Sequence, residues 1–407
     1  MSGWAGSLAA RAASVGRGLD RSLALLAAIA FIAQTGVAVM LPLLPLYATQ
    51  LGASPSVLGI LTSAFAITNA AAQLAAGFLV ERFGTRRLVP SGMSVYAAGN
   101  ALIATATAAV PLIAWRSMAG FGAGISLVAE RLYLSQVIDR ARLAFANGLL
   151  SAAGSAGSVA GPVLGGFLAE TDLRLPFVLV AVTSALAATA AWFLPRPRPG
   201  GPDTATPAAG NPTPRIDRRA LAILLAANVG LLAGFGSFIT TYGAFAEGVL
   251  LWSRREVGLV FALFGLGSIV LGPWLGHQAD RRGRRLIAIL SCVPVVLFVL
   301  ALVAALPRPV IYISAVASGG GIAGFQAAWY ALLVGATGGV RGGRAFGIVS
   351  AFSTLGIVIG ATSAAALWEA VDIHLGVAVT AVVVVFAAVA MAVFREPRPD
   401  APAPTLA

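Results

Sequence analysis

Lysine is absent from this sequence of 407 residues, in which all 27 basic side chains are arginine. Charged residues together make up only 10% of the chain, whereas an ordinary soluble domain carries roughly 25%. A water-soluble fold of this length would expose a large surface with too little charge to cover it. The scarcity of charge therefore excludes a soluble enzyme, a disordered chain and a nucleic-acid-binding domain.

Residues that carry catalysis or hold metals are also scarce. Cys292 is the single cysteine, so it can form no intramolecular disulfide, and we expect it to be a small buried hydrophobic side chain. The two histidines, His277 and His374, do not have metal-ligand spacing. Without lysine there is no Gly-Lys phosphate-binding motif. These absences predict a protein that is not an enzyme and that uses no metal or other cofactor.

Hydrophobic residues, by contrast, make up 58% of the chain, and the mean hydropathy is +0.90. A bilayer core is about 30 Å thick and is crossed by ~20 helical residues. The chain contains twelve apolar runs of that size, and each must be helical because hydrocarbon leaves free backbone polar groups unsatisfied. The runs lie near residues 22–47, 56–80, 87–108, 111–133, 146–169, 175–194, 219–245, 256–276, 285–306, 309–334, 345–367 and 375–394.

The arginines are unequally divided between the two sides of the predicted membrane. If the N-terminus is cytoplasmic, 22 of the 27 arginines lie in cytoplasmic loops and tails and four lie outside, while Arg116 lies within a span. The positive-inside rule then places both termini in the cytoplasm, and we expect the chain in the inner (plasma) membrane. Anionic lipids, not nucleic acid, are the expected counter-charge. Residues 1–21 have no short apolar core of a cleavable signal.

The chain divides into two halves around residues 195–218, a stretch rich in proline, glycine and charge that cannot span a membrane. Motifs recur across it at a constant offset of 199 residues, as in Gly59 and Gly258, or Glu81 and Asp280. We therefore predict an all-α polytopic membrane protein of twelve transmembrane helices in two six-helix bundles, a duplication typical of secondary transporters. The expected parts are a tail (1–21), a bundle (22–194), a linker (195–218), a second bundle (219–394) and a tail (395–407).

The loops after the second and eighth spans carry one repeated motif. The second copy reads GHQADRRGRR and contains Asp280 and Arg284, and the first reads GFLVERFGTRR, with Glu81 in place of aspartate and Thr85 in place of arginine. A plain positive-inside loop would explain the arginines. It would not explain a glycine-acid-glycine spacing that occurs twice.

The fourth span contains Arg116 in the sequence WRSMAGFGAG. An arginine within the membrane costs at least ~2.5–3.5 kcal/mol unless it faces water or partners, so we expect Arg116 to point into a cavity; the alternative is an arginine that reaches the outer surface. Glu130 follows fourteen residues later, about 40° from the same helix face and about 21 Å further along. We expect Glu130 on the same cavity-facing stripe, and the alternative is a solvated loop acid.

The fifth span contains closely spaced small residues and a proline in the sequence GSVAGPVLGG. Small residues four apart allow two helices to approach closely, and a proline removes a backbone hydrogen bond and bends the helix. The motif consists of Gly157, Gly161, Pro162, Gly165 and Gly166.

Together these segments resemble the major facilitator superfamily, and within it the twelve-span exporters that exchange drugs or metabolites for protons. The resemblance implies alternating access, a contact of Glu81 with the start of the eleventh span and of Asp280 with the start of the fifth, and packing of the fifth span's small face on the eighth span. The expected partners are a small-molecule substrate, protons and the lipid bilayer, and we expect a monomer. A proton-coupled importer or uniporter of a sugar or other metabolite remains the main alternative, followed by a non-transporting sensor or scaffold.

The resemblance also implies which residues bind and couple. Related exporters often carry an acid in the middle of the first span, where this chain has Gln34, so proton coupling and gating fall to Arg116, Glu130, Glu81, Asp280 and Arg284. In this family the first, fourth, seventh and tenth spans line the cavity. The substrate-binding candidates are Phe31, Gln34, Phe238, Tyr242, Gln326, Trp329 and Tyr330.

Overall fold

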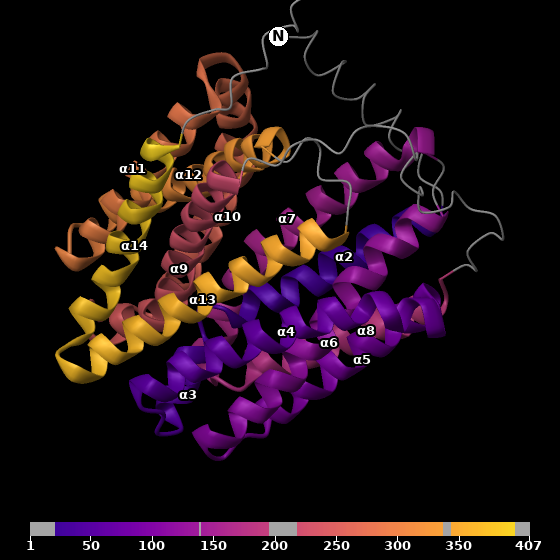
Figure 1. Ribbon diagram of the computed structural model, residues 1–407. Helices are drawn as coiled ribbons and strands as arrows, with labels where there is room; N and C mark the ends of the chain where they lie inside the picture. Colours follow the sequence, from indigo (N-terminus) through magenta and orange to yellow (C-terminus); the bar gives the residue numbers. More distant parts are fainter. Residues whose placement is uncertain (1–20, 138–139, 195–217, 337–342, 395–407) are drawn as a thin grey trace, which may run out of the picture.

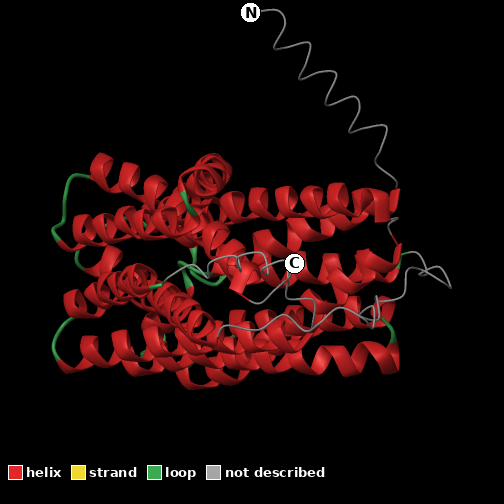
Figure 2. Ribbon diagram, turned by 45° about the horizontal axis from the view of Figure 1, so that its top comes forward, coloured by secondary structure: helices red, strands yellow, loops and turns green. Residues whose placement is uncertain are grey.

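The computed structural model describes residues 21–137, 140–194, 218–336 and 343–394, and within these ranges it contains thirteen helices and no strand (Figure 2). The predicted tails and linker therefore lie almost wholly outside the described residues. The helices are α2 (Arg21–Met40), α3 (Leu44–Gln50), α4 (Pro55–Phe83), α5 (Thr85–Ala104), α6 (Ala109–Val137), α7 (Arg140–Thr171), α8 (Leu175–Trp192), α9 (Arg218–Gly248), α10 (Arg254–Arg282), α11 (Arg284–Val303), α12 (Arg308–Ala336), α13 (Gly343–Ala370) and α14 (Ile373–Val393).

Eleven of these helices are long and apolar enough to cross a membrane, which confirms eleven of the twelve predicted spans. The exception is α5, which has the length of a span, 20 residues, but a lower apolar content. It begins with Arg86 and Arg87 and carries the buried Asn100. It nevertheless packs between α6 and α8 within the bundle, so the structure places it where a third span belongs.

The first predicted span is not one continuous helix. α2 ends at Met40 and α3 begins at Leu44, with a turn between them that contains Pro42. Proline has no backbone N–H to continue the helical ladder, which explains the break. The carbonyl oxygen of the buried Pro42 lies against α9, where a Cβ on Gly243 would be 2.7 Å from it. The break therefore allows a close contact between distant parts of the chain.

The long helices form two groups with matching packing (Figure 1). In the N-terminal group, α2–α8, helix α2 packs on α7 and α8, α4 on α6, and α5 on α6 and α8. In the C-terminal group, α9–α14, helix α9 packs on α13 and α14, α10 on α12, and α11 on α12 and α14. Each long helix of one group thus has a counterpart with equivalent neighbours in the other, and only the short α3 has none. The sequence repeat corresponds to a repeat in packing.

Two helix pairs make the most extensive contacts between the groups: α7 packs on α10, and α4 packs on α13. Smaller contacts join α9 to α3 and α4. On α4 a Cβ at Gly59 would lie 2.8 Å from the Cβ of Ala365 in α13, whereas one at Gly77 would have no described atom within 4 Å. These glycines are 18 residues, or five turns, apart and so share one face. Among the described residues, that face is tightly packed at one end of the helix and has no neighbour at the other.

Helices α7 and α10 show the same contrast at the same spacing. A Cβ on Gly166 would lie 2.9 Å from the carbonyl oxygen of Arg254, while at Gly148 nothing in the described chain lies within 4 Å. Gly258 lies against Pro162 of α7, whereas the described neighbour of Gly276 is Ala327 of its own group, 3.8 Å from a Cβ there. We call the packed end, with the N-termini of α4 and α10, the closed end, and the opposite end the open end.

Candidate functional site

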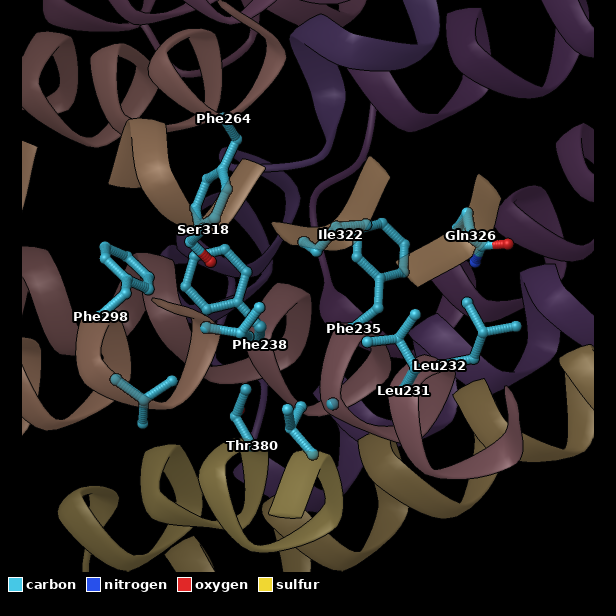
Figure 3. Close-up of a pocket in the computed structure, with 14 residues that line it drawn as sticks. Leu231, Leu232, Phe235, Phe238, Phe264, Phe298, Ser318, Ile322, Gln326 and Thr380 are labelled. Carbon is cyan, nitrogen blue, oxygen red and sulfur yellow. The ribbon is translucent and has the colours of Figure 1, made fainter. Parts of the chain in front are cut away.

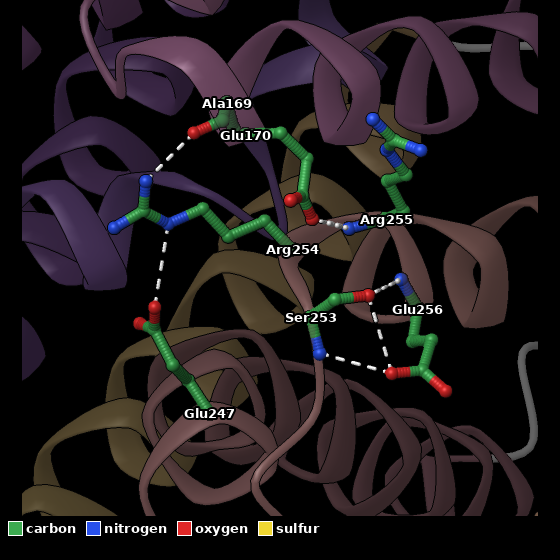
Figure 4. Close-up of polar contacts among 7 residues, drawn as sticks. All are labelled: Ala169, Glu170, Glu247, Ser253, Arg254, Arg255 and Glu256. Atoms are coloured by element: carbon green, nitrogen blue, oxygen red, sulfur yellow. Dashed lines mark hydrogen bonds and ion pairs between the residues drawn. The ribbon is translucent and has the colours of Figure 1, made fainter.

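Polar contacts join the two groups at the closed end (Figure 4). Arg254, at the start of α10, donates from Nη1 to the carbonyl oxygen of Ala169 at 2.7 Å, and its Nε pairs with Glu247 at 3.3 Å. The backbone N–H of Arg255 donates to Oε1 of Glu170 at 3.2 Å. The start of α10 is held by a capping box, in which Ser253 and Glu256 satisfy each other's backbone N–H groups. Arg254 is thereby fixed in a position where it reaches across to α7.

A second set of contacts joins α4 to the C-terminal group. Glu369, near the end of α13, accepts hydrogen bonds from the backbone N–H of Ser56, at 3.1 Å, and from its hydroxyl. The hydroxyl of Thr240 in α9 donates to that of Thr62 at 3.1 Å. Both symmetry-equivalent contacts between the groups are therefore sealed at the closed end.

The small-residue motif of α7 contacts two different helices. Gly157, Gly161 and Gly165 face α2, where Cβ atoms would lie 2.6–3.0 Å from its backbone. Only Pro162 and Gly166 of the motif face α10. The expectation that the whole face packs on the eighth span is therefore wrong for three of the five residues. The reason is geometric: residues four apart share a face, and a residue one further along is rotated by about 100°.

Arg116 lies in the interior, with 5% of its surface exposed. Its Nη1 is 2.8 Å from the sulfur of Met40, and its guanidinium carbon lies 3.9 Å from the centre of the Phe65 ring. Nε makes no hydrogen bond to any described group, and neither does the buried hydroxyl of Tyr96. The structure therefore places Arg116 away from the outer surface, in the wall of a cavity, without a counter-charge.

Arg116 lines one of three neighbouring cavities. The N-terminal cavity, of about 800 Å³, is lined by α2, α4, α5, α6 and α7. The interface cavity, of about 140 Å³, is lined by Arg116 together with residues of α2, α3, α4, α9 and α13. It shares Val37, Phe65 and Asn69 with the N-terminal cavity. It shares Phe235 with the C-terminal cavity, of about 220 Å³, which lies among α9–α12 and α14 (Figure 3).

The predicted substrate-binding residues divide into two sets. Gln34 lines the N-terminal cavity, and Phe238 and Gln326 line the C-terminal one. Tyr330 is 50% exposed and follows Gln326 by four residues, so it extends the same face of α12. Phe235, Phe264 and Phe298 were not predicted, although the spacing of Leu231, Phe235 and Phe238 on one helical face would have indicated the first of them.

The other three candidates lie outside the cavity walls, and the expectation for them needs correction. Trp329 is 1% exposed and its indole N–H donates to the carbonyl oxygen of Leu224 at 2.7 Å, so it belongs to the core of the C-terminal group. Tyr242 is equally buried, and its hydroxyl donates to the carbonyl oxygen of Val257. Phe31 lines none of the three cavities. The apolar character of these side chains did not reveal which helix face they occupy.

The predicted coupling acids lie toward the open end. Glu130 and its neighbour Arg131 line the N-terminal cavity. Asp280 pairs with Arg284 of the following helix at 3.3 Å, and both side chains are exposed. Glu81 is exposed as well. In this arrangement neither Glu81 nor Asp280 has a described contact with the opposite group, and the side chains at the starts of α7 and α13 lie outside the description. No group of His, Cys, Asp and Glu that could hold a metal occurs among the described residues.

The chain is similar in sequence to curated bacterial proteins named for drug resistance. The chain is 27% identical over 164 residues to "Multidrug resistance protein 2" of Bacillus subtilis (strain 168), and 30% identical over 158 residues to "Multidrug resistance protein 1" of the same strain. It is 27% identical over 157 residues to "Quinolone resistance protein NorA" of Staphylococcus aureus (strain MRSA252). These matches cover 39–40% of this chain and 40–41% of each relative, so the chain spans about two fifths of the relatives' length.

Solved structures share the whole fold. The nucleoside transporter NupG superposes with a TM-score of 0.73 at 12% identity, covering 92% of this chain and 98% of that one. A bacterial homologue of the iron transporter ferroportin, in an inward-facing state, gives 0.69 at 15% identity, covering 91% and 98%. The sequence profile of the Major Facilitator Superfamily matches residues 26–250 and 224–407. With its two equivalent helix groups around a central cavity, the chain is a multi-pass membrane transporter, not an enzyme, and belongs to the Major Facilitator Superfamily.

Proposed function

We propose that this transporter exports small apolar or amphiphilic molecules from the cytoplasm in exchange for protons, by alternating access. In this proposal it acts as a monomer in the inner (plasma) membrane, with both termini and the open end facing the cytoplasm. The observation that carries the proposal is the contrast along α4, α7 and α10. On each helix one face is packed at the closed end and open 18 residues away, as expected for one of the two states of a rocking transporter.

The comparisons support the direction of transport. The curated relatives are named for multidrug and quinolone resistance, and resistance of that kind follows from export. The ferroportin homologue it resembles was solved in an inward-facing state, which agrees with a cytoplasmic open end. The arginine excess expected on the cytoplasmic side includes Arg281 and Arg282, which lie at the open end.

In the proposed cycle the two groups rock about the cavities. The seal around Arg254 and Glu170 separates while the faces of Gly77 and Gly276 pack. Glu81 and Asp280 then approach the starts of α13 and α7, whose helix N-termini favour negative charge. Asp280 exchanges its present partner Arg284 for this contact. Glu130 lines the cavity and is the acid that we assign to carry the proton.

The test is uptake into inverted membrane vesicles, measured for a panel of fluorescent apolar compounds with and without an imposed proton gradient. We expect uptake that requires the gradient and is abolished by Glu130→Gln, with the variant still folded and inserted. Glu170→Gln is measured beside Glu130→Gln for comparison, because it neutralises an acid at the closed end instead of one in the cavity wall. Uptake that persists after a protonophore collapses the gradient would indicate a uniporter. Accumulation only in right-side-out vesicles would indicate an importer.

A further inference from the structure

We propose that the substrate is an amphiphilic carboxylate: Arg116 binds its anionic group, and the C-terminal cavity takes its apolar body. The inference rests on the proposed function, because it assumes that a small molecule is transported through these cavities. It adds the charge of that molecule, which neither the relatives nor the fold specifies.

The first observation is that the positive charge of Arg116 is unmatched. Arg116 as a residue is only 5% exposed, and the neighbours of its guanidinium are the Met40 sulfur at 2.8 Å and the Phe65 ring at 3.9 Å. Neither neighbour carries a negative charge, and Nε has no hydrogen-bond acceptor in the described chain. A buried charge is normally paired because burying it alone is costly. This arginine is therefore a site that lacks its partner.

The second observation is that no acid among the described residues lies in position to supply that partner. No acidic residue is among those that line the interface cavity or the C-terminal cavity. Glu130 is on the same helix but about 21 Å further along. Within the described residues, Tyr96 is the titratable side chain close enough to act electrostatically on Arg116. The counter-charge must therefore come from a bound molecule.

The donors present suit a carboxylate. A guanidinium presents parallel N–H groups that match two carboxylate oxygens, and such pairs are strong where water is excluded. The Tyr96 hydroxyl is a second buried group without a partner, and it lines the adjoining N-terminal cavity. One carboxylate has enough acceptor capacity for both groups. A cationic substrate would instead be repelled by Arg116, and a neutral one would leave it unpaired.

In the proposal, the apolar body of the substrate lies in the C-terminal cavity, across the interface from Arg116. Phe235 lines both the interface cavity and the C-terminal cavity, so the two spaces adjoin at this ring. In the proposal, a molecule bound at Arg116 extends past the ring into the second space. There Phe238, Phe264 and Phe298 gather around about 220 Å³ (Figure 3). A flat two-ring aromatic body fits such a wall, since aromatic pairs favour stacked or edge-to-face contact.

The experiment compares three probes that share one ring system and differ in charge: 2-naphthoate, 2-naphthamide and 2-naphthylmethylammonium. Equilibrium binding is measured on the purified full-length protein in lipid nanodiscs. We expect the carboxylate to bind at least about tenfold more tightly than the amide, the size expected for a charge-assisted hydrogen bond. We expect the ammonium compound to bind most weakly.

Variants then assign the preference to one side chain. Arg116→Gln should remove the preference for the carboxylate while leaving amide binding unchanged, and unchanged amide binding shows that the variant is folded. Arg116→Lys should retain the order of the three probes with weaker carboxylate binding, because an ammonium group lacks the paired donor geometry. Arg87→Gln makes the same change at an exposed arginine of α5 and should alter none of the three affinities.

Tighter binding of the amide or the ammonium compound to the wild-type protein would overturn the inference, and so would an Arg116→Gln variant that still prefers the carboxylate. In either case, gradient-driven uptake of neutral compounds into vesicles would leave the proposed export intact. If the wild-type protein binds none of the probes and vesicles accumulate no compound, both proposals fail.

Discussion

The two helix groups have the same packing but different chemistry. Gly120 of α6 lies against the backbone of Phe65 in α4, and 199 residues later Gly319 of α12 lies against the backbone of Phe264 in α10. The offset therefore relates equivalent positions on these helices. By this correspondence Arg116 in α6 is equivalent to the fully buried Ala315 in α12. Further along the same helices, Glu130 is equivalent to Trp329, a core residue.

This difference separates the residues needed for helix packing from those that line the cavities. The glycines that allow helices to approach occur in both groups, because both groups form the same helix contacts. Among the residues that line the three cavities, the charged side chains, Arg116, Glu130 and Arg131, all come from the N-terminal group. The N-terminal cavity is lined by Gln34, Asn69 and Glu130 among others, while the C-terminal cavity has a largely apolar wall. The two copies share the same helix packing, but the side chains that line their cavities differ in charge.

The largest effect is expected when the buried charge of the N-terminal group is introduced at the equivalent position of the C-terminal group. Ala315→Arg would place a guanidinium at a fully buried core position that lines none of the three cavities, at a cost of at least about 3 kcal/mol. We expect this variant to be lost from the membrane or to unfold on purification, as measured by size-exclusion chromatography. The reverse change, Arg116→Ala, should leave stability unchanged or raised, because it removes an unpaired charge. Loss of folding in Arg116→Ala would show that the charge has a structural partner.

The contrast between the closed and open ends can be tested on a single helix. Gly166→Leu introduces a side chain against the backbone of Arg254 and Arg255, and we expect a loss of about 1–3 kcal/mol, as for overpacking. Gly148→Leu is the matched control on the same face of α7 and should cost less than about 0.5 kcal/mol in this state. Thermal unfolding in detergent measures both. Equal losses would mean that the two ends are packed alike.

Variants at the equivalent positions Glu130 and Trp329 distinguish an effect on transport from an effect on stability. Trp329→Phe removes the hydrogen bond to Leu224 and should lower stability by about 1 kcal/mol, with gradient-driven uptake unchanged. Glu130→Gln should do the opposite, keeping stability and losing uptake. Thermal unfolding and vesicle uptake are measured on both variants. If Trp329→Phe loses uptake without losing stability, this tryptophan is part of the binding site after all.

The smallest effect on stability is expected at the open end. Glu81→Gln combined with Asp280→Asn removes two exposed acids, and the exposed pair of Asp280 with Arg284 contributes little. We expect no measurable change in unfolding temperature but loss of net export, because these acids act in the state where the open end closes. Undiminished export in the double variant would refute the proposed role of both acids.

Much of the fold was predictable because membrane helices are governed by local rules. Apolar length, the repeat and the motifs around Asp280 and Pro162 predicted an all-α membrane protein of this superfamily, and the comparisons confirm the resemblance. The exceptions have local causes as well. The first span is broken at Pro42, and α5 contains Arg86 and Arg87 and is less apolar than a typical span.

The sequence by itself determined which segments cross the membrane, because hydrocarbon requires every backbone group to be paired within its own helix. Only the tertiary structure decided which way side chains of one helix face. Trp329 and Gln326, three residues apart, lie in the core and in a cavity wall, and Gly165 and Gly166 face different helices. Within a membrane, an apolar side chain can face a lipid acyl chain, a neighbouring helix or a cavity. Composition therefore cannot distinguish these environments, and helix packing does.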